Sequence, residues 1–246
     1  MPPTTPEQRS FQRQSLQRTT SERRNTRGES TRLRILEAAE RLFAERGISA
    51  VPLRDIGFAA GQRNHAAVQY HFGEREEIVR ALMDYRGGAS EAMRADMVAG
   101  IMLAATKPTV ADVVGAFVRP LAIHFQPDNY YLPFLSLYIS EEGGYEGLVG
   151  VHVGASVMAL RTLLGHLAPG IPERVLDERW WVTLTSSVHA LGRYHTARRK
   201  REHLPAEIED LVSDLIAFLS AGILAPVADG YHRQDRGETT GAEGRL

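Results

Sequence analysis

The sequence predicts an all-α protein, with an N-terminal three-helix domain followed by a larger helical bundle. Between two polar ends, apolar residues recur at spacings of three and four, and no segment alternates apolar and polar residues as a strand does. Prolines and glycines separate these segments. Hydrophobic residues make up 43% of the 246 residues, which is enough to form a core in one large domain or two small ones.

The composition excludes several classes of protein. There is no cysteine, so disulfides, thiolate zinc sites and cysteine nucleophiles are excluded. We find no apolar run of about 18 residues, and the first thirty residues lack the apolar stretch of a signal peptide. We therefore expect a soluble, cytoplasmic protein that needs no cofactor and has no membrane partner.

Charge is unevenly distributed along the chain. Residues 1–80 carry 14 basic and 10 acidic side chains, whereas residues 81–246 carry 15 basic and 20 acidic ones. The overall net charge of −1 hides this difference. The first third of the chain is therefore the part expected to approach a polyanion such as DNA.

Composition divides the chain into four parts. Residues 1–29 are polar and rich in arginine, and we predict a disordered tail that is either solvated or in contact with DNA. Residues 30–80 form the predicted small domain, and residues 81–226 form the predicted bundle. Residues 227–246 form a second predicted disordered tail without the basic excess.

The small domain begins with two predicted helices and a tight turn. Residues 31–46 carry apolar side chains at helical spacing, and Gly47 supplies a left-handed C-terminal cap. Pro52 suits the first position of a second helix, over residues 53–60, because its missing N–H would be unpaired there anyway. Gly61 stops this helix, since glycine adopts positive φ readily.

A third short helix completes the arrangement. It is predicted over residues 65–71, with Asn64 as its cap, and a fourth helix begins at Glu74. Two short helices joined by a glycine turn and flanked by two further helices are typical of a helix-turn-helix, whose second helix enters the major groove of DNA.

Three runs in this segment resemble the TetR family of bacterial regulators. They are ILEAAERLFAERG at 35–47, LRDIGFAAG at 53–61 and YHFGEREEIV at 70–79. The resemblance covers about fifty residues and implies a DNA-binding transcription regulator. It also implies a set of buried positions, namely Leu36, Ala39, Phe43, Leu53, Ile56, Ala60, Val68, Phe72 and Ile78.

The resemblance implies DNA contacts as well. The third helix would face the bases, where glutamine can pair with adenine and arginine with guanine. His71 and Arg75 match the closing His-Phe pair and the phosphate-holding lysine of the family, and Arg54 would hold phosphate from the second helix. The predicted DNA-binding residues are Arg54, Arg63, Asn64, His65, Ala66, Ala67, Gln69, Tyr70, His71 and Arg75.

The segment departs from the family pattern at several places. The stretch from Ala60 to Phe72 is one residue longer than usual, which predicts a widened turn. Pro52 stands where a capping Thr or Ser is common, and Gln69 stands where a phosphate-contacting Tyr is common. Gly57 replaces a usual alanine inside a helix, at a cost of about 1 kcal/mol that packing must offset.

The second domain is predicted to contain helices at about 74–104, 109–125, 129–142, 150–167, 173–201 and 205–224. Its many aromatic and histidine residues would suit either an apolar ligand cavity or an ordinary core. The resemblance implies an effector between the middle helices, and the aromatic composition suggests an uncharged or weakly polar one. The predicted ligand-binding residues are Phe117, Phe134, Tyr138, Met158, Trp181 and His189.

The resemblance also implies a homodimer. The last two helices, 173–201 and 205–224, carry apolar stripes that would form a four-helix interface with a second copy. Two recognition helices one turn of DNA apart would then read an inverted repeat on double-stranded DNA.

Two other classes of function compete with an effector-controlled regulator. Catalysis is disfavoured because His189 and His195 lie six residues apart, on different sides of a helix, and no HExxH or Gly-x-Ser-x-Gly pattern occurs. A DNA-binding architectural protein or adaptor without an effector would require a solidly packed second domain. The sequence predicts a repressor released from its operator by a small molecule, while activation and co-repression stay open.

Overall fold

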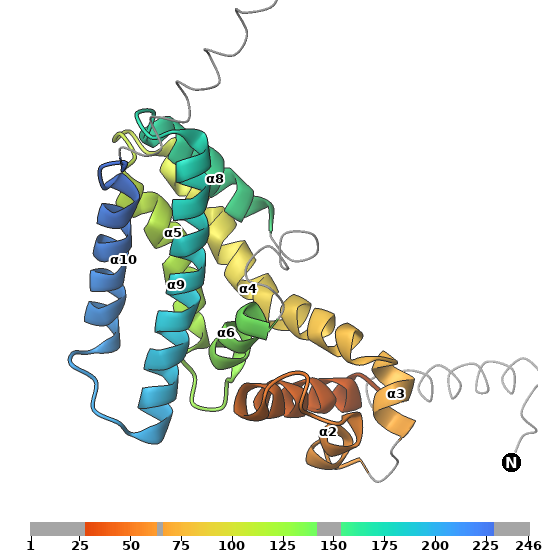
Figure 1. Cartoon of the computed structure of the whole chain (residues 1–246). Coiled ribbons are helices and arrows are strands. Elements are labelled where there is room, and N and C mark those ends of the chain that lie inside the picture. Colours follow the sequence, from red (N-terminus) through yellow and green to blue (C-terminus); the bar gives the residue numbers. More distant parts are fainter. Residues whose placement is uncertain (1–27, 63–65, 142–153, 229–246) are drawn as a thin grey trace, which may run out of the picture. The chain divides into compact units, whose positions relative to one another are not determined.

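We analysed a computed structural model of the chain, which describes residues 28–62, 66–141 and 154–228 (Figure 1). Within these ranges the regular structure is helical and no strand occurs, which confirms the all-α prediction. The chain forms two compact units that divide between Met83 and Asp84, three residues later than the predicted boundary.

Within its described residues, 28–62 and 66–83, the first unit contains three helices and the start of a fourth. The first helix is described over residues 28–46, so residues 28–30 are helical although the sequence predicted a helix only from residue 31. It is followed by α2 (Leu53–Ala59), α3 (Ala66–Phe72) and the first turns of α4 (Arg75–Leu103) (Figure 1). Of the nine positions predicted to be buried, eight are buried, and Leu53 is half-buried.

Two glycines end helices as predicted. Gly47 has φ 90° and Gly61 has φ 70°, values that side chains with a Cβ adopt only with strain. The prediction for Pro52 was wrong by one position. Its ψ of 141° is extended, so it is the cap residue before α2 and not the first helical residue.

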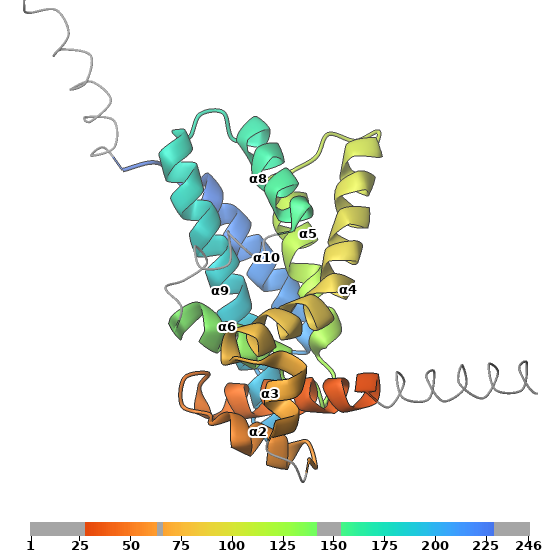
Figure 2. The same cartoon turned by 90° about the vertical axis from the view of Figure 1, so that its right-hand side faces the viewer.

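The second unit is a bundle built around α5 (Val110–Leu121). This helix packs against α8 (Ala155–Leu167), α9 (Glu173–Lys200) and α10 (Ile208–Leu224), and most of its residues are buried (Figures 1 and 2). The short 3-10 helix η1 (Ala122–His124) follows α5 directly, and α6 (Tyr131–Glu141) packs against α9. The observed helices lie close to the predicted ones where both are described.

The contact between α6 and α9 depends on a glycine. A Cβ at Gly192 would lie 3.2 Å from the Leu132 carbonyl oxygen and 3.3 Å from the Ser136 Cβ. Both neighbours belong to α6, and one of them is backbone. The two helices therefore approach to a separation that only glycine permits at this position.

The start of α5 is fixed by a capping box. The Thr109 hydroxyl accepts a hydrogen bond from the Asp112 N–H at 3.2 Å, and the Asp112 carboxylate accepts one from the Thr109 N–H at 2.8 Å.

Among the described residues, no helix combines the length and the apolar character needed to cross a membrane.

Candidate nucleic-acid interface

The turn between α2 and α3 begins with a well-formed helix end. The Gln62 N–H donates to the Gly57 carbonyl at 2.9 Å, and the Gly61 N–H donates to the Phe58 carbonyl at 3.0 Å. With Gly61 in the left-handed region, these bonds satisfy two of the last carbonyls of α2. The chain can then reverse into α3 without leaving these carbonyls unpaired.

Gly57 marks the closest approach of α2 and α3. A Cβ at this position would lie 3.3 Å from Cγ2 of Val68, a buried residue of α3. This is tighter than an ordinary van der Waals contact, so Gly57 lets the two helices pack closely. The packing supplies the reason, missing from the sequence alone, for a glycine inside α2.

The α3 helix has an inner and an outer face. Val68 and Phe72, four residues apart, are buried, with exposed fractions of 0% and 8%. Gln69 is exposed, and Tyr70 is 85% exposed. The helix is thus held by two apolar side chains, while Gln69 and Tyr70 face solvent.

The other predicted DNA contacts lie on α3 or just before it. Ala67 and His71 are half-buried, and Ala66 is the first residue of α3. Arg63, Asn64 and His65 lie outside the described residues. The predicted cap at Asn64 and the predicted widening of the turn fall there too.

Arg54 lies on the surface of α2 beside a carboxylate. Its side chain is 73% exposed, and its Nε lies 3.5 Å from the Asp55 carboxylate. Asp55 also lies 3.5 Å from the guanidinium of Arg46. The position suits a phosphate contact, although Asp55 offsets part of the positive charge.

Arg75 takes part in the structure of the first unit. Its Nη1 donates to the carbonyls of Ile48 and Ser49 at 2.9 and 2.5 Å, and its Nη2 donates to the carbonyl of Val51 at 2.8 Å. The guanidinium therefore ties the start of α4 to the segment that leads into α2. The resemblance implied a phosphate contact and gave no hint of this role, because the partners lie 24 to 27 residues away.

The six predicted ligand-binding residues lie at different depths in the second unit. Phe117 and Phe134 are fully buried core residues, and Met158 is 57% exposed. Tyr138 and Trp181 are half-buried, and His189 is exposed, with its Nδ1 2.5 Å from the Ser136 hydroxyl. Two pockets of this unit, of about 660 and 310 Å³, are lined by other residues.

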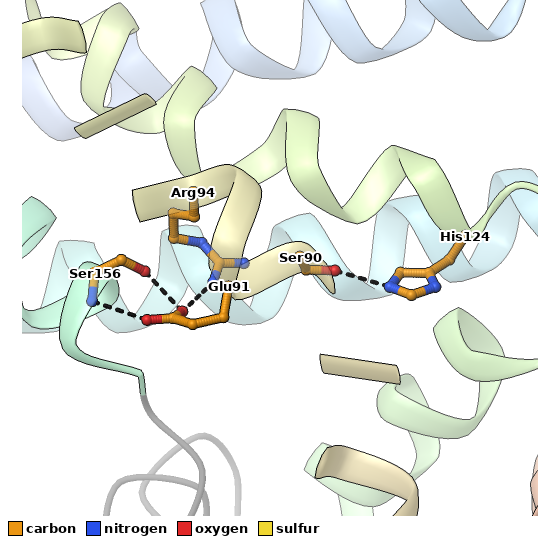
Figure 3. A network of polar contacts seen from close by, with 5 residues as sticks. All are labelled: Ser90, Glu91, Arg94, His124 and Ser156. Carbon is orange, nitrogen blue, oxygen red and sulfur yellow. Dashed lines mark hydrogen bonds and ion pairs between the residues drawn. The ribbon is translucent and has the colours of Figure 1, made fainter. Parts of the chain in front are cut away.

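A polar network joins α4 to η1 inside the second unit (Figure 3). Asn129 accepts a hydrogen bond from the Tyr131 N–H at its Oδ1, which orients its Nδ2 toward the His124 Nδ1, 3.2 Å away. His124 then carries its proton on Nε2 and donates to the Ser90 hydroxyl at 2.8 Å. Burial, together with the charges of Arg86 and His195, lowers the pKa of His124 to about 4, so the ring is neutral at physiological pH.

A second set of contacts joins α4 to the N-terminus of α8 (Figure 3). The Glu91 carboxylate accepts from the Ser156 N–H at 3.0 Å and from the Ser156 hydroxyl at 2.7 Å. Arg94 lies 2.8 Å from the same carboxylate. Burial alone would raise the pKa of Glu91, but the bonds from Ser156 and the charge of Arg94 bring this pKa below its usual value.

Arg94 is a buried cation that the sequence interpretation missed. It is 5% exposed, its guanidinium lies 5.2 Å from the centre of the Phe117 ring, and its Nε has no hydrogen-bond partner among the described residues. A signal was present in the sequence. Ser90, Arg94 and Val98 follow one another at four-residue spacing, which puts all three on the buried face of α4.

Comparison with known proteins gives matches over the first unit. The family model described as bacterial regulatory proteins, tetR family, matches residues 35–82. An HTH-type transcriptional repressor of Mycobacterium tuberculosis is 47% identical over 53 residues, which is 22% of this chain and 28% of that protein. The HTH-type transcriptional regulator TtgR of Pseudomonas putida is 43% identical over 56 residues, which is 23% of this chain and 26% of that protein.

Solved structures align over more of the chain at lower identity. HlyIIR, a hemolysin II transcriptional regulator, aligns with a TM-score of 0.48 and 20% identity, over 78% of this chain and 98% of that one. A TetR-family transcriptional regulator from Mesorhizobium loti aligns with a TM-score of 0.49 and 12% identity, over 80% of this chain and 96% of that one.

The assignment therefore rests on the first unit. The matched segments span about a quarter of the length of the two relatives, and they contain the helices that form the helix-turn-helix. The matched residues 35–82 also include the buried positions and the two left-handed glycines described above. The N-terminal segment over residues 35–82 therefore matches the TetR family of bacterial regulatory proteins, and the family match is confined to this segment.

Proposed function

We propose that the chain is a cytoplasmic transcriptional regulator that binds an inverted repeat in double-stranded DNA as a homodimer and acts without catalysis. The observation that carries the proposal is the outer face of α3. Val68 and Phe72 hold this helix to the first unit, while Gln69 and Tyr70 are presented to solvent, with Tyr70 85% exposed.

The chemistry of these two side chains suits DNA. The amide of Gln69 can donate to and accept from the edge of an adenine, and the Tyr70 hydroxyl can donate to a phosphate. The net positive charge of residues 1–80 would draw this unit toward the polyanion.

The first test is selection of bound sequences from a random duplex pool, using the full chain. We expect enrichment of one inverted repeat. Replacing Gln69 or Tyr70 with alanine should then weaken binding to that repeat by about 10-fold or more, because a base or phosphate contact is lost. Binding is measured by titration at several salt concentrations.

Tyr85→Ala is the matched control, since Tyr85 is a second exposed tyrosine, 42% exposed, on α4. It should leave operator affinity unchanged. If Gln69→Ala and Tyr70→Ala bound the repeat as tightly as the natural protein, the assignment of α3 as the reading helix would be wrong. If no sequence were enriched, the operator itself would be in doubt.

The dimer is proposed from the outer face of α10. Leu211, Leu215 and Leu219 are buried against the rest of the bundle. On the same helix, Phe218 is 72% exposed, and the exposed Ala221 and Gly222 follow it at helical spacing. An exposed phenylalanine among small residues is what a second copy of α10 would cover.

Phe218→Glu should convert the dimer to a monomer at micromolar concentration, because the charge would have to be buried without a partner. Sedimentation equilibrium gives the mass directly. Leu103→Glu is the control, since Leu103 is an 86% exposed apolar residue at the end of α4, and this variant should stay dimeric. A dimeric Phe218→Glu protein, or a monomeric natural protein, would contradict the proposal.

We further propose that a small molecule bound by the second unit releases the protein from its operator. The ligand would favour a conformation that fits DNA poorly, by an amount equal to its differential affinity for the two conformations. Two features of the second unit support this over a purely architectural role. One is the presence of pockets, and the other is the buried cation Arg94, whose Nε has no partner in the part of the chain that the structure describes.

A further inference from the structure

A pocket of about 310 Å³ lies at the C-terminal end of α9. One side is formed by Phe125, Gln126 and Pro127, in the loop between η1 and α6. The other side consists of four residues at the end of α9, namely His195, Arg198, Arg199 and Arg201. The pocket thus combines an apolar side with three guanidinium groups.

Two of the three guanidinium groups are available to a ligand. Arg199 is held over the Tyr130 ring, 3.7 Å from its centre, and donates to the Tyr130 hydroxyl at 2.8 Å. Neither Arg198 nor Arg201 forms an ion pair with a carboxylate among the described residues. The acidic residue that follows them, Glu202, lies 3.9 Å from Lys200.

Arg201 occupies a position that usually holds glycine. Its φ is 56°, in the left-handed region, where it ends α9. The Glu202 N–H donates to the Ala197 carbonyl at 2.9 Å, and the Arg201 N–H donates to the Arg198 carbonyl at 3.1 Å. This is the same turn that Gly61 makes after α2, with an arginine in place of the glycine.

His195 lines the pocket and contacts the loop residues on its opposite side. It is 2% exposed, its Nε2 donates to the Gln126 carbonyl at 3.1 Å, and its ring centre lies 5.9 Å from that of Phe125. Its Nδ1 has no hydrogen-bond partner among the described residues. Burial lowers the pKa of His195, and the bond to the Gln126 carbonyl raises it by less. The charges of Arg199 and Arg198 lower this pKa as well, so the positive charge of the pocket resides on the arginines.

We propose that this pocket binds a small organic acid, with its carboxylate against Arg198 and Arg201 and its apolar body against Phe125 and Pro127. A guanidinium matches a carboxylate with two parallel hydrogen bonds, and two guanidinium groups facing one pocket favour an anion over the neutral ligand expected from the sequence. The volume suits a molecule of about ten heavy atoms.

The pocket is connected to α4 through the loop that lines it. Phe125 directly follows His124, which donates to the Ser90 hydroxyl of α4 (Figure 3). The same histidine contacts Asn129 at the far end of the loop. A ligand that restrains the positions of residues 125–127 would therefore act next to the hydrogen bond between His124 and Ser90 of α4. Binding of the acid to this pocket does not depend on the proposed function as a transcriptional regulator. An effect of the acid on release from DNA does rest on that proposed function.

The test is calorimetric titration of the full chain with benzoate, phenylacetate and octanoate, each against its primary amide at constant ionic strength. We expect at least one of the acids to bind with a Kd on the order of 1 mM or tighter, and its amide not to bind. Arg198→Gln/Arg201→Gln should raise that Kd by at least about 10-fold. Arg193→Gln should not, because Arg193 stacks on Tyr194 and does not line the pocket.

Four results would overturn the proposal. They are no binding of any acid to the folded protein, equal binding of acid and amide, unchanged binding by the double variant, and weaker DNA binding by the double variant in the absence of acid. The last result would mean that these arginines contact phosphates of DNA. If an acid binds as expected but leaves operator affinity unchanged, the site stands and its role in release is wrong.

Discussion

Replacing Gly192 with leucine is expected to lower the free energy of unfolding of the second unit by about 2–3 kcal/mol. The added side chain would collide with the Leu132 carbonyl, 3.2 Å from the new Cβ, and with the Ser136 Cβ, 3.3 Å away. A backbone oxygen cannot rotate aside as the end of a long side chain can, so α6 and α9 must separate. The measurement is denaturant unfolding followed by tryptophan fluorescence, since both tryptophans of the chain lie on α9.

Gly100→Leu is the matched control for this prediction. Gly100 lies inside α4, and a Cβ there would meet nothing within 4 Å. Leucine should therefore leave stability unchanged or raise it by up to about 1 kcal/mol through helix propensity. Equal midpoints for the two variants would show that the α6–α9 contact does not depend on the missing side chain.

Replacing Arg75 with methionine is expected to cost the first unit about 2–4 kcal/mol. Three backbone carbonyls would lose a charged donor, and the segment before α2 would lose its tie to α4. Arg75→Lys should restore only part of the loss, because an ammonium group cannot match the fork of a guanidinium. Amide hydrogen exchange at residues 48–56 reports the change directly.

Arg80→Met separates this effect from a general loss of charge. Arg80 lies on the same helix, is half exposed, and pairs with Glu77 one turn away. It should leave exchange at residues 48–56 unaltered. Normal stability of Arg75→Met combined with a smaller salt dependence of DNA binding would show instead that Arg75 acts mainly on phosphate, as the family resemblance implied.

The positions of the helices could be predicted because they depend on local patterns. The apolar spacing around Phe43 and Ile56, and the glycines at 47 and 61, act within a few residues of themselves. The error at Pro52 arose because proline suits both the cap and the first helical position, and only ψ distinguishes them.

Composition alone does not decide which aromatic residues contact a ligand. A buried aromatic side chain looks the same in a sequence whether it fills a core or lines a cavity, and Phe117 and Phe134 are both fully buried. The groups that carry unusual chemistry in this unit are Arg94, His124 and the arginines at the end of α9. His124 contacts Ser90 and Arg199 contacts Tyr130, both far away in sequence, so no local pattern reveals these contacts. For Arg94, the four-residue spacing with Ser90 and Val98 indicates burial but not the neighbouring groups.

The left-handed arginine at the end of α9 also bears on attempts to stabilise this protein. An L-residue with a Cβ in that region is less stable than glycine by about 1 kcal/mol, so a designer seeking thermostability would choose Arg201→Gly. The same change would remove one of the two available guanidinium groups of the pocket. Resistance to heat and affinity for an acid would then oppose each other at a single residue.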